Sequence, residues 1–157
     1  MRFAFHSYIA EVNAITRGDE NAKSDYDSVI NEIFRITGSS KCIDRITRLA
    51  NYSATESQLK IFRDCDCGII GLFGVPDNDP TDRDSYYLAG DISQYFKTHY
   101  YYEDSSNKLK FIKTSYIIPA CQNDPIAYRQ YLNSLEHSNA IKYIEIFVHE
   151  DQLNTLK

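Results

Sequence analysis

The chain has 157 residues and a mass of 18.2 kDa, which fits a single compact domain spanning residues 1–157. Hydrophobic residues make up 43% and charged residues 25%, enough apolar side chain for a core, so wholesale disorder is excluded. No apolar run is long enough to cross a membrane, and the N-terminal residues lack the pattern of a signal peptide. We therefore expect a cytoplasmic protein with no membrane partner.

The negative charge is concentrated in the middle of the chain. The formal net charge is −5, and residues 64–106 alone carry nine acidic and two basic residues. Nucleic-acid-binding modules usually present a basic stripe, so this balance argues against that class. A local acidic patch can instead steer a basic protein partner.

The first elements predicted are a strand and a helix. Residues 2–12 are rich in aromatic and branched side chains and predict a strand, and polar residues 13–23 predict a loop. Ser24, with Asp27 three positions later, resembles a capping box that begins a helix, and Gly38 supplies its end. The apolar residues on one face of this helix are Val29, Ile30, Ile33, Phe34 and Thr37.

The next segments favour short strands. Residues 42–52 are compatible with a helix face or a strand, and β-branched residues favour the strand. Residues 59–62 and 69–75 predict two strands joined by a turn over 64–68. Residues 76–84 hold two prolines and four aspartates and predict a loop.

A helix and a hairpin are predicted after this loop. Asp91 is the expected cap of a helix whose shared face carries Ile92, Tyr95, Phe96 and His99. A turn over 104–107 would place Tyr102 opposite Leu109 on an apolar face. The same register places Tyr101 opposite Lys110 on a charged face.

The last segments are a third helix, opened by Asp124 and Pro125, and a strand over residues 140–148 that is apolar on both faces. Strands that follow one another without helices between them imply a mixed or mainly antiparallel sheet. With about three helices packed on that sheet, the predicted class is α+β.

The residues that usually bind metals or carry catalysis form no known spacing. Zinc sites use paired Cys or His at fixed separations, and Cys65-x-Cys67 has no partner pair, so we expect free thiols at all four cysteines. His6, His99, His137 and His149 are too far apart in sequence for a ligand motif, and whether they converge in space is left open. Three glycines in residues 68–74 lack a following helix, and this favours bulges or close packing in a strand over phosphate binding.

The acidic loop also fails the pattern of a calcium loop. Counting from Asp77, position six is Asp82 and position twelve is Leu88, where an EF-hand needs glycine and glutamate. We therefore predict no metal and no cofactor. Contact with a basic protein is the first use that we expect of this loop.

The sequence thus predicts a small cytosolic protein-interaction module, such as an immunity protein, antitoxin or inhibitor from a mobile element or defence system. Tyrosine suits interfaces because it combines large contact area with a polar tip. The predicted partner-binding residues are Asp77, Asp79, Asp82, Asp84, Tyr86 and Tyr101. The alternative is a metal-dependent phosphodiesterase or nuclease whose site is assembled from distant residues, and a nucleic-acid-binding module comes third. The sequence assigns no catalytic residues, and this argues against an enzyme.

Overall fold

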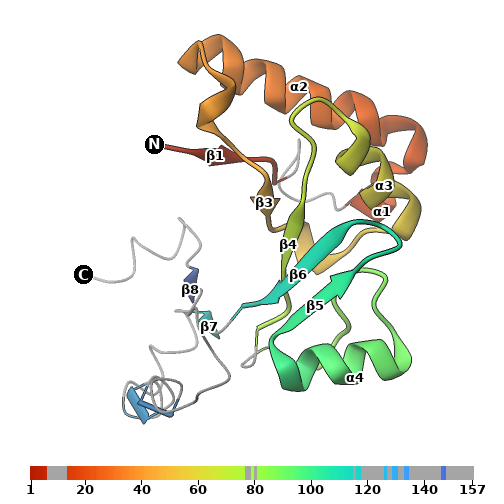
Figure 1. The fold of residues 1–157 in the computed structure, drawn as a ribbon, viewed down its shortest axis with the longest axis vertical. Coiled ribbons are helices and arrows are strands. Elements are labelled where there is room, and N and C mark those ends of the chain that lie inside the picture. Colours follow the sequence, from red (N-terminus) through yellow and green to blue (C-terminus); the bar gives the residue numbers. More distant parts are fainter. Residues whose placement is uncertain are drawn as a thin grey trace.

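The computed structural model shows an α+β fold built around a mixed sheet (Figure 1). It describes residues 1–6, 14–76, 79, 81–114, 116–117, 126, 129–130, 133–134 and 146–147. The central sheet has the order β3-β4-β6-β5, with bounds Ile46–Thr47, Gly71–Gly74, Leu109–Lys113 and Tyr101–Asp104. Strands β3, β4 and β6 are parallel, whereas β5 runs antiparallel to β6. Of the two sheet types expected from the sequence, the mixed type is the one found.

Two short strand pairs accompany this sheet. Strand β1 (Phe3–Ala4) pairs in parallel with β2 (Ile43–Asp44), and β7 (Tyr116–Ile117) pairs in parallel with β8 (Ile146–Phe147). Strand β1 lies within the strand predicted over 2–12, and β8 lies within the one predicted over 140–148.

Residues 126, 129–130 and 133–134 are helical, in agreement with the predicted third helix. The residues predicted to open that helix, Asp124 and Pro125, lie outside the described part of the chain.

The first long helix begins earlier than the sequence suggested. Helix α1 (Ala14–Arg17) and helix α2 (Asp19–Thr37) occupy most of the segment predicted as a loop, and they meet at Gly18, whose φ is 76°. The predicted capping box at Ser24 is wrong, because Ser24 lies inside α2 and its carbonyl accepts a hydrogen bond from the hydroxyl of Ser28 at 2.7 Å. The predicted end is confirmed: Gly38 is left-handed, and its N–H donates to the carbonyl of Phe34.

The strand predicted over residues 59–62 is a helix instead. Helix α3 (Glu56–Asp64) follows a capping box in which the hydroxyl of Thr55 accepts from the amide of Gln58 at 3.1 Å. The side chain of Gln58 accepts in return from the amide of Thr55 at 3.0 Å. Leu59 and Phe62 are three residues apart and both buried, so the spacing that resembled a strand is one side of a helix. Two 3₁₀ turns, η1 (Ser40–Cys42) and η2 (Ala50–Tyr52), flank β2 and β3.

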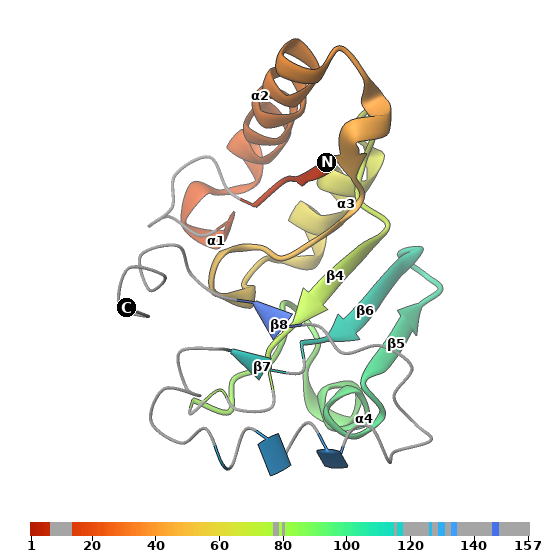
Figure 2. The same ribbon diagram turned by 90° about the vertical axis from the view of Figure 1, so that its left-hand side faces the viewer.

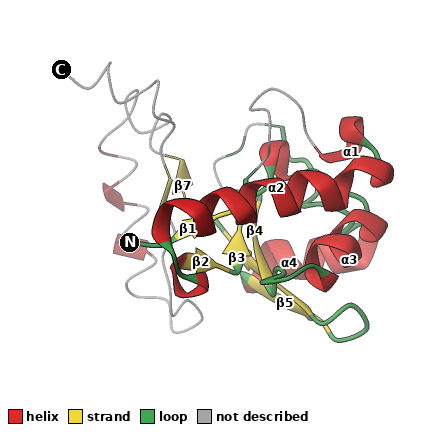
Figure 3. Ribbon diagram, turned by 90° about the horizontal axis from the view of Figure 1, so that it is seen from above, coloured by secondary structure: helices red, strands yellow, loops and turns green. Residues whose placement is uncertain are grey.

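Two aromatic clusters hold these elements together. Phe5, Tyr26 and Phe62 lie within 5.0–5.7 Å of one another, ring centroid to ring centroid, and join the chain after β1 to α2 and α3. The ring of Phe111 on β6 is the centre of the second cluster. Its neighbours, at 5.7–6.4 Å, are Tyr86, Tyr87, Phe96 and Tyr102. Seen from above, α2 runs across the ends of the strands (Figure 3).

Helix α4 (Gly90–His99) packs on the face of the sheet that carries Phe111. The predicted cap at Asp91 is wrong, since the N-cap is Ala89 and Asp91 lies in the first turn. The expected shared face is also divided: Phe96 is buried, whereas Ile92 and Tyr95 are exposed. Gly74 explains how α4 approaches β4 so closely, because a Cβ there would lie 2.5 Å from Cε1 of Phe96. Of the two interpretations that the sequence favours for this glycine, close packing is the one found.

The hairpin forms with a register shifted by two residues from the predicted one. Asp104 pairs with Leu109, Tyr102 with Phe111 and Glu103 with Lys110. The turn therefore comprises residues 105–108. A shift of two keeps each side chain on its expected face, so the division into an apolar and a charged face is confirmed while the individual pairs are wrong.

We predict that Thr55→Ala lowers the free energy of unfolding by about 1 kcal/mol, because it removes the acceptor that caps α3. Ser24→Ala is the matched control, since Ser24 lies inside α2 and alanine is favourable in a helix, so little change is expected. Urea titrations of the two variants give both values. Equal losses at the two positions would contradict the assignment of the helix starts.

Candidate functional site

The described carboxylates of the acidic loop are paired within the molecule. Asp79 contacts Arg83 at 2.8 Å, and Lys97 on α4 contacts Asp82 at 3.0 Å and Asp84 at 3.7 Å. Arg83 and Lys97 are the two basic residues of the acidic segment 64–106. Asp77, also predicted to bind a partner, lies outside the described residues.

Asp79 is the most enclosed of these carboxylates, with 3% of its side chain exposed. Burial alone raises its pKa, but the hydroxyl and amide of Thr81 and the guanidinium of Arg83 donate to it, and together they lower the pKa below its usual value. Asp79 is therefore ionised at neutral pH and already has its partners. Because its carboxylate already has these partners, Asp79 is poorly placed to bind a basic group of a second molecule.

A pocket of about 210 Å³ lies between this loop, α4 and the carboxyl ends of β4 and β6. Its charged lining residues are Asp79, Asp82, Arg83, Lys97 and Lys113. The carboxyl ends of parallel strands are a common place for ligands. Here, however, Arg83 and Lys97 pair with the aspartates, and Nζ of Lys113 donates to the carbonyl of Lys97 at 2.8 Å. A charged ligand would have to displace these contacts.

The two tyrosines predicted to bind a partner have different surroundings. The hydroxyl of Tyr86 accepts from the amide of Leu49 at 3.3 Å and donates to the carbonyl of Phe73 at 2.7 Å, so it ties the loop to β4. Tyr101 on β5 is 44% exposed, and its hydroxyl donates to Glu103 at 2.9 Å. Of the two predicted tyrosines, Tyr101 is therefore the one whose ring is exposed to solvent.

Strand β5 lies at the outer edge of the central sheet (Figures 1 and 2). The amide of Lys113 donates to the carbonyl of Tyr100 at 3.0 Å. This bond shows that Tyr100 and every second residue after it direct their backbone groups toward β6. In an antiparallel pair every second residue directs its N–H and C=O away from the partner strand. On β5 these residues are Tyr101 and Glu103, and we call their outward backbone groups the β5 edge. Within the described part of the chain no backbone group pairs with them.

The opposite end of the same sheet is covered. Strand β3 lies there, and the hydroxyl of Thr47 at its end donates to the carbonyl of Phe5. Nδ1 of His6 forms a second side-chain to backbone hydrogen bond there, with the carbonyl of Arg48. The chain after β1 therefore lies alongside the end of β3, whereas β5 is the edge strand that no described residue pairs with on its outer side.

A buried polar network holds β5 in place. Asp104 is 8% exposed, and its carboxylate accepts from the hydroxyl of Tyr87 at 2.5 Å and from the side-chain and backbone nitrogens of Asn107 at 2.7 and 3.0 Å. Asn107 also donates to Glu56 at the start of α3 at 3.0 Å, and its carbonyl accepts from Arg63 at 2.7 Å. These bonds explain the shifted register, because Asp104 is satisfied as the last residue of the strand instead of the first of the turn.

The network shifts the pKa values of Asp104 and Tyr87 in opposite directions. Burial of Asp104 alone would raise its pKa, but the hydrogen bonds from Tyr87 and Asn107 lower the pKa below its usual value. Burial and the hydrogen bond to Asp104 raise the pKa of Tyr87, so its hydroxyl stays protonated. Neither Tyr87 nor Asn107 is among the residues predicted from the sequence; the Asp104-x-x-Asn107 spacing, typical of a side-chain-capped turn, is the signal that points to Asn107.

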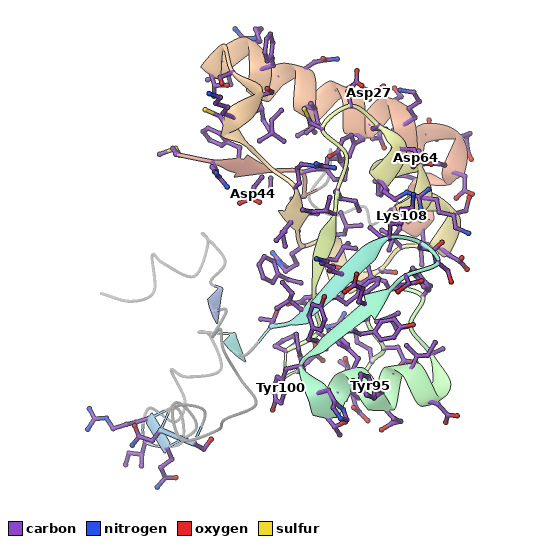
Figure 4. All side chains as sticks on the ribbon, viewed as in Figure 1. Asp27, Asp44, Asp64, Tyr95, Tyr100 and Lys108 are labelled. Carbon is purple, nitrogen blue, oxygen red and sulfur yellow. The ribbon has the colours of Figure 1, made fainter. Side chains whose placement is uncertain are left out.

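An aromatic surface on α4 flanks the β5 edge. Tyr95 is 48% exposed and stacks on His99 with centroids 3.9 Å apart, while its ring meets Tyr102 of β5 edge to face at 6.4 Å. Figure 4 shows Tyr95 and Tyr100 at the α4 end of the sheet and Lys108 at the hairpin tip. Because side chains alternate along a strand, Tyr102 and the α4 residues lie on one side of the β5 edge and Tyr101 on the other.

No catalytic or metal-binding constellation occurs among the described residues. His6 lies beside Arg48 and His99 against Tyr95, and His137 and His149 lie outside the described residues. No group of three or more His, Cys, Asp or Glu in the described ranges could hold a metal ion. Burial is the main cause that raises the pKa of Cys65 to about 11, so this thiol stays protonated at neutral pH. None of the helices in the described part of the chain is long and apolar enough to cross a lipid bilayer.

We predict that Asp104→Asn lowers the free energy of unfolding at pH 7 by about 1–3 kcal/mol, because it replaces a buried carboxylate that accepts several hydrogen bonds. A carboxyl group whose pKa is lowered on folding stabilises above its unfolded pKa, and that stabilisation is lost as the pH falls through the folded value. The deficit of the variant should therefore shrink below about pH 4. Urea titrations from pH 7 to pH 2.5 check this.

Asp91→Asn is the control for this series, since Asp91 is exposed on the first turn of α4. We expect a change within about 0.5 kcal/mol at pH 7. A pH-independent deficit for Asp104→Asn would show that the carboxylate charge does not contribute.

Comparison with known proteins adds no relative: no family model matches the sequence, and neither a curated protein nor a solved structure is significantly similar to it. The function must therefore be argued from the geometry above.

Proposed function

We propose that this protein is a protein-binding module, and that it takes up an extended segment of its partner along the β5 edge. The single observation that supports this is that no backbone group in the described ranges pairs with the outward N–H and C=O groups of Tyr101 and Glu103. An extended segment that pairs there would satisfy the outward N–H and C=O groups, which is the recognition mode called strand addition.

The side chains around the β5 edge suit such a contact. Tyr101 lies on one side of the strand and Tyr95, whose ring contacts Tyr102, lies on the other, and both are more than 40% exposed. Large aromatic side chains with a polar tip dominate the energetics of many interfaces. They would contact alternate side chains of the added strand and give the pairing its specificity.

The acidic loop is a weaker candidate for the main contact. Asp79 is enclosed and paired with Arg83, and Lys97 is shared by Asp82 and Asp84. Exposed ion pairs contribute at most about 1 kcal/mol, so the side chain of Asp82, which is 90% exposed, could exchange Lys97 for a basic group of a partner at little cost. We assign the loop a secondary role beside α4. A role as an antitoxin, immunity protein or inhibitor fits a module of this kind and stays a proposal.

Photo-crosslinking in the host cell tests the function. A benzophenone side chain at position 101 should give a protein adduct, whereas the same group at Phe34 should not, because Phe34 is equally exposed (52%) but lies on α2. The adduct at 101 should disappear in Glu103→Pro, which removes one outward N–H, and persist in Glu103→Ala, which keeps it. Adducts of equal yield at 34 and 101, or an adduct that tolerates Glu103→Pro, would refute binding at the β5 edge.

A further inference from the structure

We infer that the strand taken up at the β5 edge is β5 of a second copy of this chain, so that two copies form a symmetric dimer. This inference rests on the proposed function and names its partner. The β5 edge is self-complementary in register and in hydrogen bonding.

The register follows from which backbone groups face outward. Two antiparallel β5 strands related by a two-fold axis through Tyr102 place Tyr101 of each copy opposite Glu103 of the other. Both outward residues of each copy then exchange N–H···O=C bonds, four in all. The pairing makes one continuous sheet in which the two β5 strands are adjacent.

Neighbouring registers fail on the residues that they bring together. A shift of two residues in one direction places Glu103 opposite Glu103, and directly opposed like charges destabilise a strand pair. A shift of two in the other direction requires His99 to pair with Glu103, but His99 is the last residue of α4 and has helical backbone. Shifts of one residue pair outward groups with groups already used by β6. The register centred on Tyr102 is the one that uses the whole edge.

The side chains also match across the two-fold axis. Tyr102 would meet Tyr102 of the second copy as a close, non-hydrogen-bonded pair, and each ring already contacts Tyr95. On the other side of the sheet Tyr101 of each copy would lie beside Glu103 of the other, while its hydroxyl keeps Glu103 of its own chain as the acceptor. A four-residue strand and one helix flank bury an area at the low end of specific interfaces. We therefore expect a dissociation constant of about 1–100 µM.

Sedimentation velocity over a range of concentrations tests the dimer. The wild-type chain should pass from 18.2 kDa to twice that mass as its concentration rises. Glu103→Pro should raise the dissociation constant about tenfold or more, and Glu103→Ala should change it less than threefold, because only the proline removes hydrogen-bond donors at the interface. Circular dichroism and the melting temperature verify that both variants fold.

A pair of cysteine variants tests the register without proline. Tyr101→Cys mixed with Glu103→Cys should give a disulfide-linked dimer under mild oxidation, because directly paired residues lie about 5.5 Å apart between Cα atoms, within the range of a disulfide. Neither variant alone should do so above the background of the native cysteines. A dimer without this crosslink would refute the register.

The outcomes separate this inference from the proposed function. A wild-type chain that stays at 18.2 kDa at all concentrations, together with a photo-adduct to another protein at position 101, would refute the second copy and keep the binding module. A monomer with no adduct at position 101 would refute both.

Discussion

The packing of Phe111 is the constraint on which the part of this molecule that carries the proposed binding surface depends. The ring sits on the middle of β6, next to Leu72 of β4 in the parallel register, and both are fully buried. Phe96 of α4 and Tyr102 of β5 pack against it from two different elements. Burying one aromatic ring therefore positions the helix and the strand that together form the proposed binding surface. The loop joins them through Tyr86 and Tyr87.

Much of the fold was predictable where a local signal had one meaning. Gly38 ended a helix as expected, β4 lies within the strand predicted over 69–75, and the two faces of the hairpin were assigned correctly. The errors have physical causes. A short apolar run such as residues 59–62 is compatible with both the two-residue period of a strand and the 3.6-residue period of a helix. The Thr55–Gln58 capping box just before it is the signal that decides for the helix. The hairpin register depended on Asp104, whose partner Tyr87 is 17 residues away and cannot be read from local spacing.

The candidate site was less predictable than the fold. Tyr101 was singled out from composition, and its exposure agrees with a binding role that is still to be tested. Tyr95 was expected to share a face with the buried Phe96, because helical spacing gives the stripe but not the width of the buried part. The pairing of loop aspartates with Lys97 joins residues 13 to 15 positions apart, so net charge along the sequence overstated the free charge of the loop. The openness of β5 depends on strand order, which no local pattern encodes.

The covered side at β3 has a consequence for the size of any assembly. A sheet with two open sides can recruit copies without end and grow into a fibre, whereas a sheet with one open side is saturated by a single pairing. In this chain the residues that follow β1 occupy the far side through contacts with Thr47 and Arg48. Loosening that short N-terminal segment would expose a second edge and convert a closed contact into an aggregation hazard, so residues far from the proposed binding surface limit the size of the assembly that it can form.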